Sequence, residues 1–139
     1  MLDPRSTRDM GIDGFDRVLT QEALDRLFPR ERANRFFDSL LGDSSEGAYD
    51  IRLEYKGYTG DTLRFEFLLL QRPNKCLACH LTAGLPDVFS RHPVIDIQGL
   101  VQEIERMIHG SATCAAWKLG PTLEKAPDLH AIPFTIRLA

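Results

Sequence analysis

The spacing of apolar residues changes near residue 50, and this change constrains the fold more than any other feature of the sequence. Before it, apolar residues recur at intervals of three and four, which is typical of amphipathic helices. After it, apolar and polar residues alternate, which is typical of strands with one face in water. The chain is therefore predicted to be an α+β protein built on an antiparallel sheet.

Two helices are predicted before the change. Thr20 is a suitable N-cap for a short helix that ends at Phe28, and Pro29 breaks this helix and suits the first position of the next. The second helix carries a clean apolar stripe, and Gly42 stands where a glycine would end it. The stripe consists of Ala33, Phe36, Phe37, Leu40 and Leu41.

Three strands joined by tight turns are predicted next. Residues 50–58 and 63–70 are predicted strands, with Thr59-Gly60 as the turn between them. Apolar residues alternate with charged ones as far as Glu66, and from Leu68 to Leu70 both faces are apolar. A Pro-Asn pair is the second turn signal, and residues 75–82 are apolar on both faces, as in a strand inside a sheet. Successive strands with tight turns form an antiparallel three-stranded meander, which is the arrangement expected here.

One amphipathic helix and a C-terminal β-hairpin that joins the sheet complete the prediction. Asp96 caps the helix, whose apolar residues again form one stripe. Residues 113–119 and 134–138 are predicted to be strands, and residues 120–130 a loop with two prolines. Pro133 begins the last strand, so this strand is expected at or near an edge of the sheet.

Length and charge limit the classes of function. A chain of 139 residues is long enough for one domain and too short for two of ordinary size, so residues 15–139 are predicted to be one domain after a mobile tail over residues 1–14. A net charge of −3 gives no general attraction to nucleic acid or anionic lipid, both of which favour a basic surface. The sequence has no apolar run long enough for a membrane span and no secretory segment, so a cytoplasmic protein is expected.

The motif Cys76-x-x-Cys79-His80 resembles the haem-attachment motif of c-type cytochromes. The resemblance implies a haem bound covalently through both thiols, with His80 as an axial ligand. A zinc site that includes Cys114 is a second interpretation, and a redox dithiol a third. However, residues three apart on the predicted strand 75–82 point to opposite faces. Buried structural thiols, with neither cofactor nor metal, are therefore the prediction.

The loop over residues 84–93 is predicted to carry the ligand-binding residues. Arg91 and His92 lie in it beside Asp87, with Asp96 shortly after, and an Arg and a His together bind an anion or move a proton. The predicted function is a non-catalytic binding module for a partner protein or a small anionic ligand, recognised where this loop and the later proline-rich loop approach the sheet. A metal- or haem-binding protein and a small enzyme that uses His92 with Arg91 are the alternatives.

Overall fold

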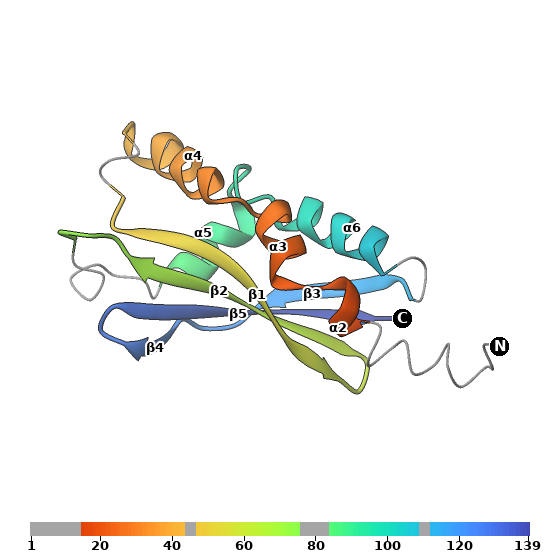
Figure 1. Ribbon diagram of the computed structural model, residues 1–139. Coiled ribbons are helices and arrows are strands. Elements are labelled where there is room, and N and C mark those ends of the chain that lie inside the picture. Colours follow the sequence, from red (N-terminus) through yellow and green to blue (C-terminus); the bar gives the residue numbers. More distant parts are fainter. Residues whose placement is uncertain (1–14, 44–46, 76–83, 109–111) are drawn as a thin grey trace.

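The computed structural model describes residues 15–43, 47–75, 84–108 and 112–139, in which helices cover one face of an antiparallel sheet (Figure 1). No helix in these ranges is long and apolar enough to cross a membrane. The elements in chain order are α2 (Phe15–Val18), α3 (Gln21–Leu27), α4 (Arg30–Leu41), β1 (Tyr49–Thr59), β2 (Thr62–Gln71), α5 (Leu85–Arg91), α6 (Ile97–Met107), β3 (Cys114–Leu119), β4 (Leu123–Ala126) and β5 (Leu129–Leu138).

Three predicted helix ends, at Thr20, Gly42 and Asp96, are confirmed, whereas Pro29, predicted at the first helical position, is instead the N-cap of α4, which begins at Arg30. Thr20 caps α3, because its hydroxyl oxygen accepts a hydrogen bond from the backbone N–H of Ala23 at 3.2 Å. Gly42 ends α4 with a φ of 83°, a left-handed conformation that glycine adopts without steric cost. Asp96 caps α6, and its carboxylate accepts from the N–H of Gly99 at 3.1 Å. The short helix α2 was not predicted.

The sheet order is β1-β2-β5-β3, and β4 also pairs with β5. Strand β2 pairs with β1 along one edge and with β5 along the other, from Thr62 opposite Arg137 to Leu70 opposite Leu129. The predicted three-stranded meander is therefore wrong, because β5 holds the place beside β2 that a third strand would take. Residues 76–83, nearly all of that predicted strand, lie outside the described residues, as does the predicted tail.

Strand β5 is an interior strand of ten residues, whereas a short strand at or near an edge was predicted. Pro133 lies inside it, and its carbonyl accepts from the N–H of Gly120 at 2.8 Å. In an antiparallel strand the N–H and C=O of one residue point to the same neighbour. The side of Pro133 that lacks an N–H therefore faces residues 120–122, which lie between β3 and β4. No strand residue at that point needs a hydrogen bond from Pro133.

Both predicted loops contain regular structure. Residues 85–91 form α5, because Pro86 lies in its first turn, where a backbone N–H has no helical partner to lose, and Phe89 becomes fully buried. Within residues 120–130, β4 pairs with the first part of β5. Pro86 thus stands at a helix start, and Pro127 lies in the turn that joins β4 to β5.

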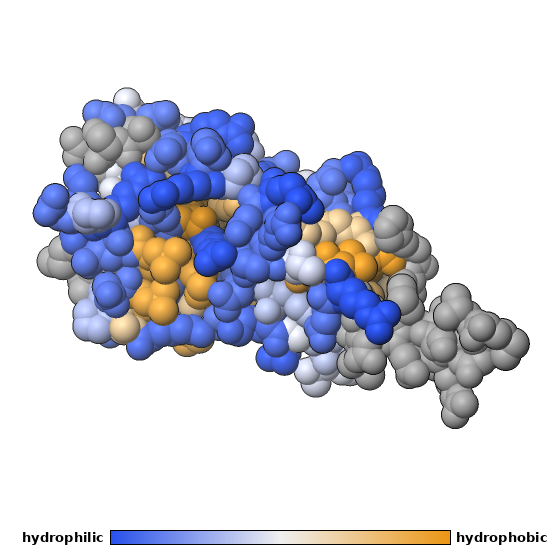
Figure 2. Space-filling model, viewed as in Figure 1, coloured by the Kyte–Doolittle hydropathy of each residue, from blue (hydrophilic) through white to orange (hydrophobic). Residues whose placement is uncertain are grey.

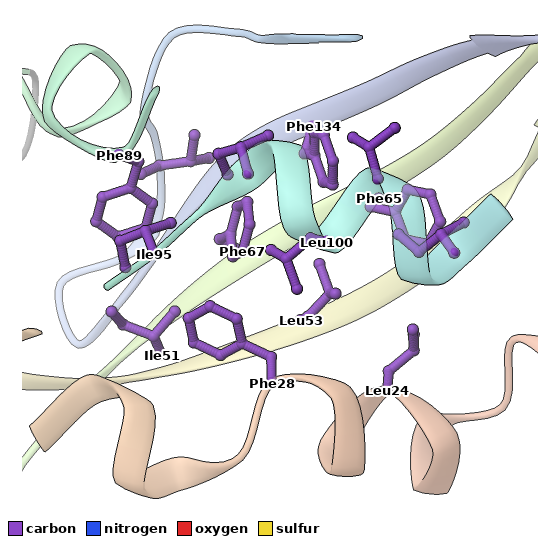
Figure 3. Close-up of a cluster of buried hydrophobic side chains, with 14 of the residues drawn as sticks. Leu24, Phe28, Ile51, Leu53, Phe65, Phe67, Phe89, Ile95, Leu100 and Phe134 are labelled. Carbon is purple, nitrogen blue, oxygen red and sulfur yellow. The ribbon is translucent and has the colours of Figure 1, made fainter. Parts of the chain in front are cut away.

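The core lies between the sheet and the helices, with Phe67 of β2 near its centre (Figure 3). The ring centroid of Phe67 lies 5.6 Å from that of Phe28, 5.5 Å from Phe89 and 5.4 Å from Phe134. These distances are typical of favourable aromatic pairs. One ring thus joins the end of α3, the helix α5 and the strand β5.

The opposite face of the sheet carries no helix among the described elements, and we call it the helix-free face (Figure 1). Side chains alternate along a strand, so this face holds the even-numbered residues of β2 from Thr62 to Leu70 and the odd-numbered residues of β5 from Leu129 to Arg137. Residues paired with them in register share the face. Its side chains are free to contact something other than the core.

Candidate functional site

Asp87 and Arg91, two of the predicted ligand-binding residues, lie on α5 and pair with each other. A guanidinium nitrogen of Arg91 lies 2.7 Å from a carboxylate oxygen of Asp87, and both side chains are more than 70% exposed. An exposed pair four residues apart on a helix is a common surface arrangement that contributes little to stability. Ligand binding by these two residues stays a prediction.

His92 and Asp96, the other two predicted residues, lie at helix ends. The Nδ1 atom of His92 accepts from the N–H of Val94 at 3.2 Å, and its ring packs edge-on against Phe36 with the centroids 4.8 Å apart. Asp96 is the N-cap of α6 and lines a hollow of about 330 Å³ with Arg32. Both side chains therefore have structural roles within the fold, and these roles do not require a ligand.

The cysteine motif lies outside the described residues, so Cys76, Cys79 and His80 are not placed. Cys114, the further metal ligand considered, is half-buried on β3, and burial together with the charge of Glu105 raises its pKa to about 11. The raised pKa favours the protonated thiol at neutral pH. In the part of the chain that the structure describes, no three His, Cys, Asp or Glu side chains are grouped to hold a metal ion.

A pocket of about 420 Å³ lies where α3 and the start of α4 meet the edge strand β1, and we call it the edge pocket. Phe28 and Ile51 form its apolar floor with Leu70, and charged side chains form its rim. Figure 2 shows an apolar area over β1 and β2 inside a hydrophilic surround. The lining residues are Asp25, Phe28, Arg30, Asp50, Ile51, Arg52 and Leu70.

Every charged group on the rim of the edge pocket has a partner of opposite charge. Arg52 donates to both carboxylate oxygens of Asp25 at 3.2 Å, and Arg30 donates to Asp50 at 3.0 Å. Burial opposes ionisation of Asp25, but hydrogen bonds from Arg52 and Gln21 outweigh it and lower its pKa. These pairs fasten the helices to the edge of the sheet.

A second pocket, of about 380 Å³, lies where β2, β5 and β3 run side by side, and we call it the sheet pocket. Lys118 of β3 is opposite Thr135 of β5, and Arg137 of β5 lies between Ala116 of β3 and Thr62 of β2. These five side chains share the helix-free face. The sixth lining residue, Trp117, donates from its indole Nε1 to Gln98 of α6 at 3.1 Å.

The cations of the sheet pocket differ from those elsewhere on the same face. Lys125 and Lys56 both approach Glu66, at 2.8 Å and 4.0 Å. Lys118 and Arg137 are exposed, and no acidic side chain of the described residues lies within ion-pair distance of either. Two cationic side chains therefore line one pocket, and neither has an ion-pair partner among the described residues.

Geometry, rather than a sequence motif, brings the polar residues of the sheet pocket together. Thr135 and Arg137 alternate with the buried Phe134 and Ile136, which predicts that they face water. Their neighbours on β2 and β3 depend on strand order and register, which alternation alone does not contain. Comparisons with protein-family models, with curated proteins and with solved structures found no match.

Proposed function

We propose that this chain is a non-catalytic binding module that recognises a small anionic ligand at the sheet pocket. The observation that carries the proposal is the pair of exposed cations, Lys118 and Arg137, on adjacent strands with no acidic partner among the described residues. Like charges held close together raise the local potential and attract an anion. A volume of about 380 Å³ falls in the range of small-molecule pockets.

The chemistry of the lining favours binding over catalysis. The polar side chains are an ammonium, a guanidinium and two hydroxyls, from Lys118, Arg137, Thr62 and Thr135. The first two donate hydrogen bonds and carry positive charge across the neutral range. None of the described residues that line the pocket has a carboxylate, imidazole or thiol to act as a general base or nucleophile.

The strands that carry the pocket support its use as a preformed site. Strand β5 pairs with β2 and with β3 on its two sides, so the backbone at Thr135 and Arg137 is held from both. Side chains on such a scaffold lose less conformational freedom on binding than side chains on a loop.

The proposal is tested by backbone amide chemical-shift mapping of the full chain with a mixture of small carboxylates, sulfonates and phosphates at constant ionic strength. Residues 116–118 and 135–137 are expected to shift and to saturate. The variant Lys118→Gln should reduce the shifts. Its matched control, Lys125→Gln, removes a cation from the same face that already has an acidic partner, and should leave them unchanged.

Shifts that arise at residues 84–93 while the sheet pocket stays silent would refute the proposal. They would return the site to Arg91 and His92, as the sequence predicts. Equal loss of binding in Lys118→Gln and Lys125→Gln would also contradict it, because binding would then follow total charge and not the pocket.

A further inference from the structure

We infer that the sheet pocket takes a phosphoryl group, the doubly charged end of a small phosphate monoester, between Lys118 and Arg137. The inference rests on the proposed function and adds the chemistry of the ligand. Lys118 is paired with Thr135, two residues from Arg137 on the same face of β5, so the two cations are diagonal neighbours. Such neighbours have Cβ atoms about 7 Å apart, so both side chains can reach one small group placed between them.

The count of charges favours a phosphoryl group over a carboxylate. A phosphate monoester carries about −1.5 to −2 at neutral pH, which matches two cations, whereas a carboxylate would compensate only one. Arginine offers a planar fork that binds two oxygens of one phosphate, and lysine adds a compact charge with three donors. The pair Arg137 and Lys118 thus provides both kinds of phosphate contact.

The remaining lining residues provide a third donor and space. The hydroxyl of Thr135 lies on β5 between the positions of Lys118 and Arg64, and no side-chain hydrogen bond within the described residues involves it. The hydroxyl of Thr62 donates to Asp61 at 3.0 Å, so it has an acceptor already. Ala116, opposite Arg137, has only a methyl group and leaves room above the strand.

The positive charge is local, which favours a soluble small molecule over a lipid surface. Lys56 and Lys125, on the same face, lie beside Glu66. Arg64 extends toward β1, where its guanidinium donates to the carbonyl of Lys56 at 3.4 Å. An anionic membrane surface attracts proteins that have an extended basic area. Here the basic cluster is confined to the sheet pocket, and the chain as a whole has a net charge of −3.

The test is a titration of the full chain with inorganic phosphate, and separately with acetate at matched ionic strength, followed by the amide shifts of residues 116–118 and 135–137. The fluorescence of Trp117, the one tryptophan of the sequence and a lining residue, is a second readout. Phosphate should give saturable changes and acetate much smaller ones. Lys118→Gln and Arg137→Gln should each weaken phosphate binding by about tenfold or more, while Lys118→Arg and the control Lys125→Gln should bind as the parent chain does.

Five outcomes would overturn the inference. Equal responses to phosphate and acetate would do so, as would unchanged phosphate binding in Lys118→Gln with an unchanged melting temperature. Binding only to phosphatidylcholine vesicles that contain phosphatidylinositol phosphate, with no response to soluble phosphate, would replace the small molecule by a lipid headgroup. If phosphate is inert while citrate still shifts the sheet pocket, the phosphoryl assignment is wrong and the proposed function stands; if every anion leaves the pocket silent, both are wrong.

Discussion

The edge pocket and the sheet pocket are similar in size, at about 420 and 380 Å³, and each is lined by two cationic side chains. They differ in what the cations face. In the edge pocket Arg52 and Arg30 meet Asp25 and Asp50, whereas the cations of the sheet pocket meet no acid of the described residues. Charged side chains that the fold does not pair are therefore the better evidence for a ligand site in this molecule.

The two pockets also stand on different supports. The edge pocket joins separate elements, and its pairs connect residues that lie 20 and 27 positions apart in the chain. The sheet pocket stands on strands that backbone hydrogen bonds already hold together. Removing a charge should therefore cost stability in the edge pocket and almost none in the sheet pocket.

The largest effect is expected at the floor of the edge pocket. Phe28 is 2% exposed and packs on Phe67, so Phe28→Ala should lower the free energy of unfolding by about 3–5 kcal/mol. Urea denaturation measures this loss. Leu123→Ala, which truncates a side chain 44% exposed, is the control and should change stability by less than about 1 kcal/mol. Similar losses in both variants would show that the floor is not part of the core.

A smaller loss is expected from Asp50→Asn. Asp50 accepts from Arg30 and from Arg72, both at 3.0 Å, and the side chains of Asp50 and Arg72 are only 18% and 15% exposed. Replacing the carboxylate weakens two charged hydrogen bonds and should cost about 1–3 kcal/mol in urea denaturation. A neutral result would mean that the charges of the edge pocket do not fasten the helices, and the contrast between the pockets would fail.

Asp25→Asn should have a still smaller effect, and one that depends on pH. The folded pKa of Asp25 is lowered, so its contribution is complete well above its ordinary value of about 4 and fades as pH falls through the lowered pKa. Because the pair with Arg52 is nearly half exposed, the loss at pH 7 should stay below about 1 kcal/mol. Melting temperatures of the parent and the variant should converge near pH 3 or below; a constant difference would point to a cause other than ionisation.

The smallest effect is expected in the sheet pocket. Lys118→Gln should change the free energy of unfolding by less than about 0.5 kcal/mol, with the sign toward greater stability, because it relieves repulsion from Arg137. Added sodium chloride should narrow the difference by screening that repulsion. A loss above about 1 kcal/mol in urea denaturation would show that Lys118 has a role in the fold, and would remove the main support for a ligand there.

Local features of the fold were predictable from the sequence, whereas non-local ones were not. The stripe of α6 and the caps Thr20, Gly42 and Asp96 depend on neighbours within a few residues and are confirmed. The predicted stripe of α4 is confirmed only in part, because Leu40 and Leu41 at its end are 48% and 51% exposed. The place of β5 beside β2 depends on residues far apart in the chain, and adjacent turns favoured a meander instead. Helix α5 was missed because two prolines resembled loop signals and the burial of Phe89 is a tertiary effect.

The candidate site also depends on non-local features that the sequence pattern does not contain. Alternation predicts that Thr135 and Arg137 face water, but their approach to Lys118 and Thr62 requires the register of three strands. The residues that were singled out, Arg91 with Asp87 and His92 with Asp96, were grouped by closeness in the sequence. In the structure they pair locally or end helices, so nearness along the chain did not identify a shared pocket.

The position of β5 also has a consequence for how the chain is made. It is the last strand along the sequence but an interior one in the sheet, so during translation β1 and β2 emerge long before the strand that pairs with them. Until residues 129–138 leave the ribosome, the second edge of β2 has neither its partner nor the cover of Phe134. Pairing two strands that are so far apart in the sequence is slow, and an unpaired apolar strand edge promotes aggregation. Chaperone dependence during synthesis, and severe aggregation when β5 is deleted, are the behaviour to expect of this topology.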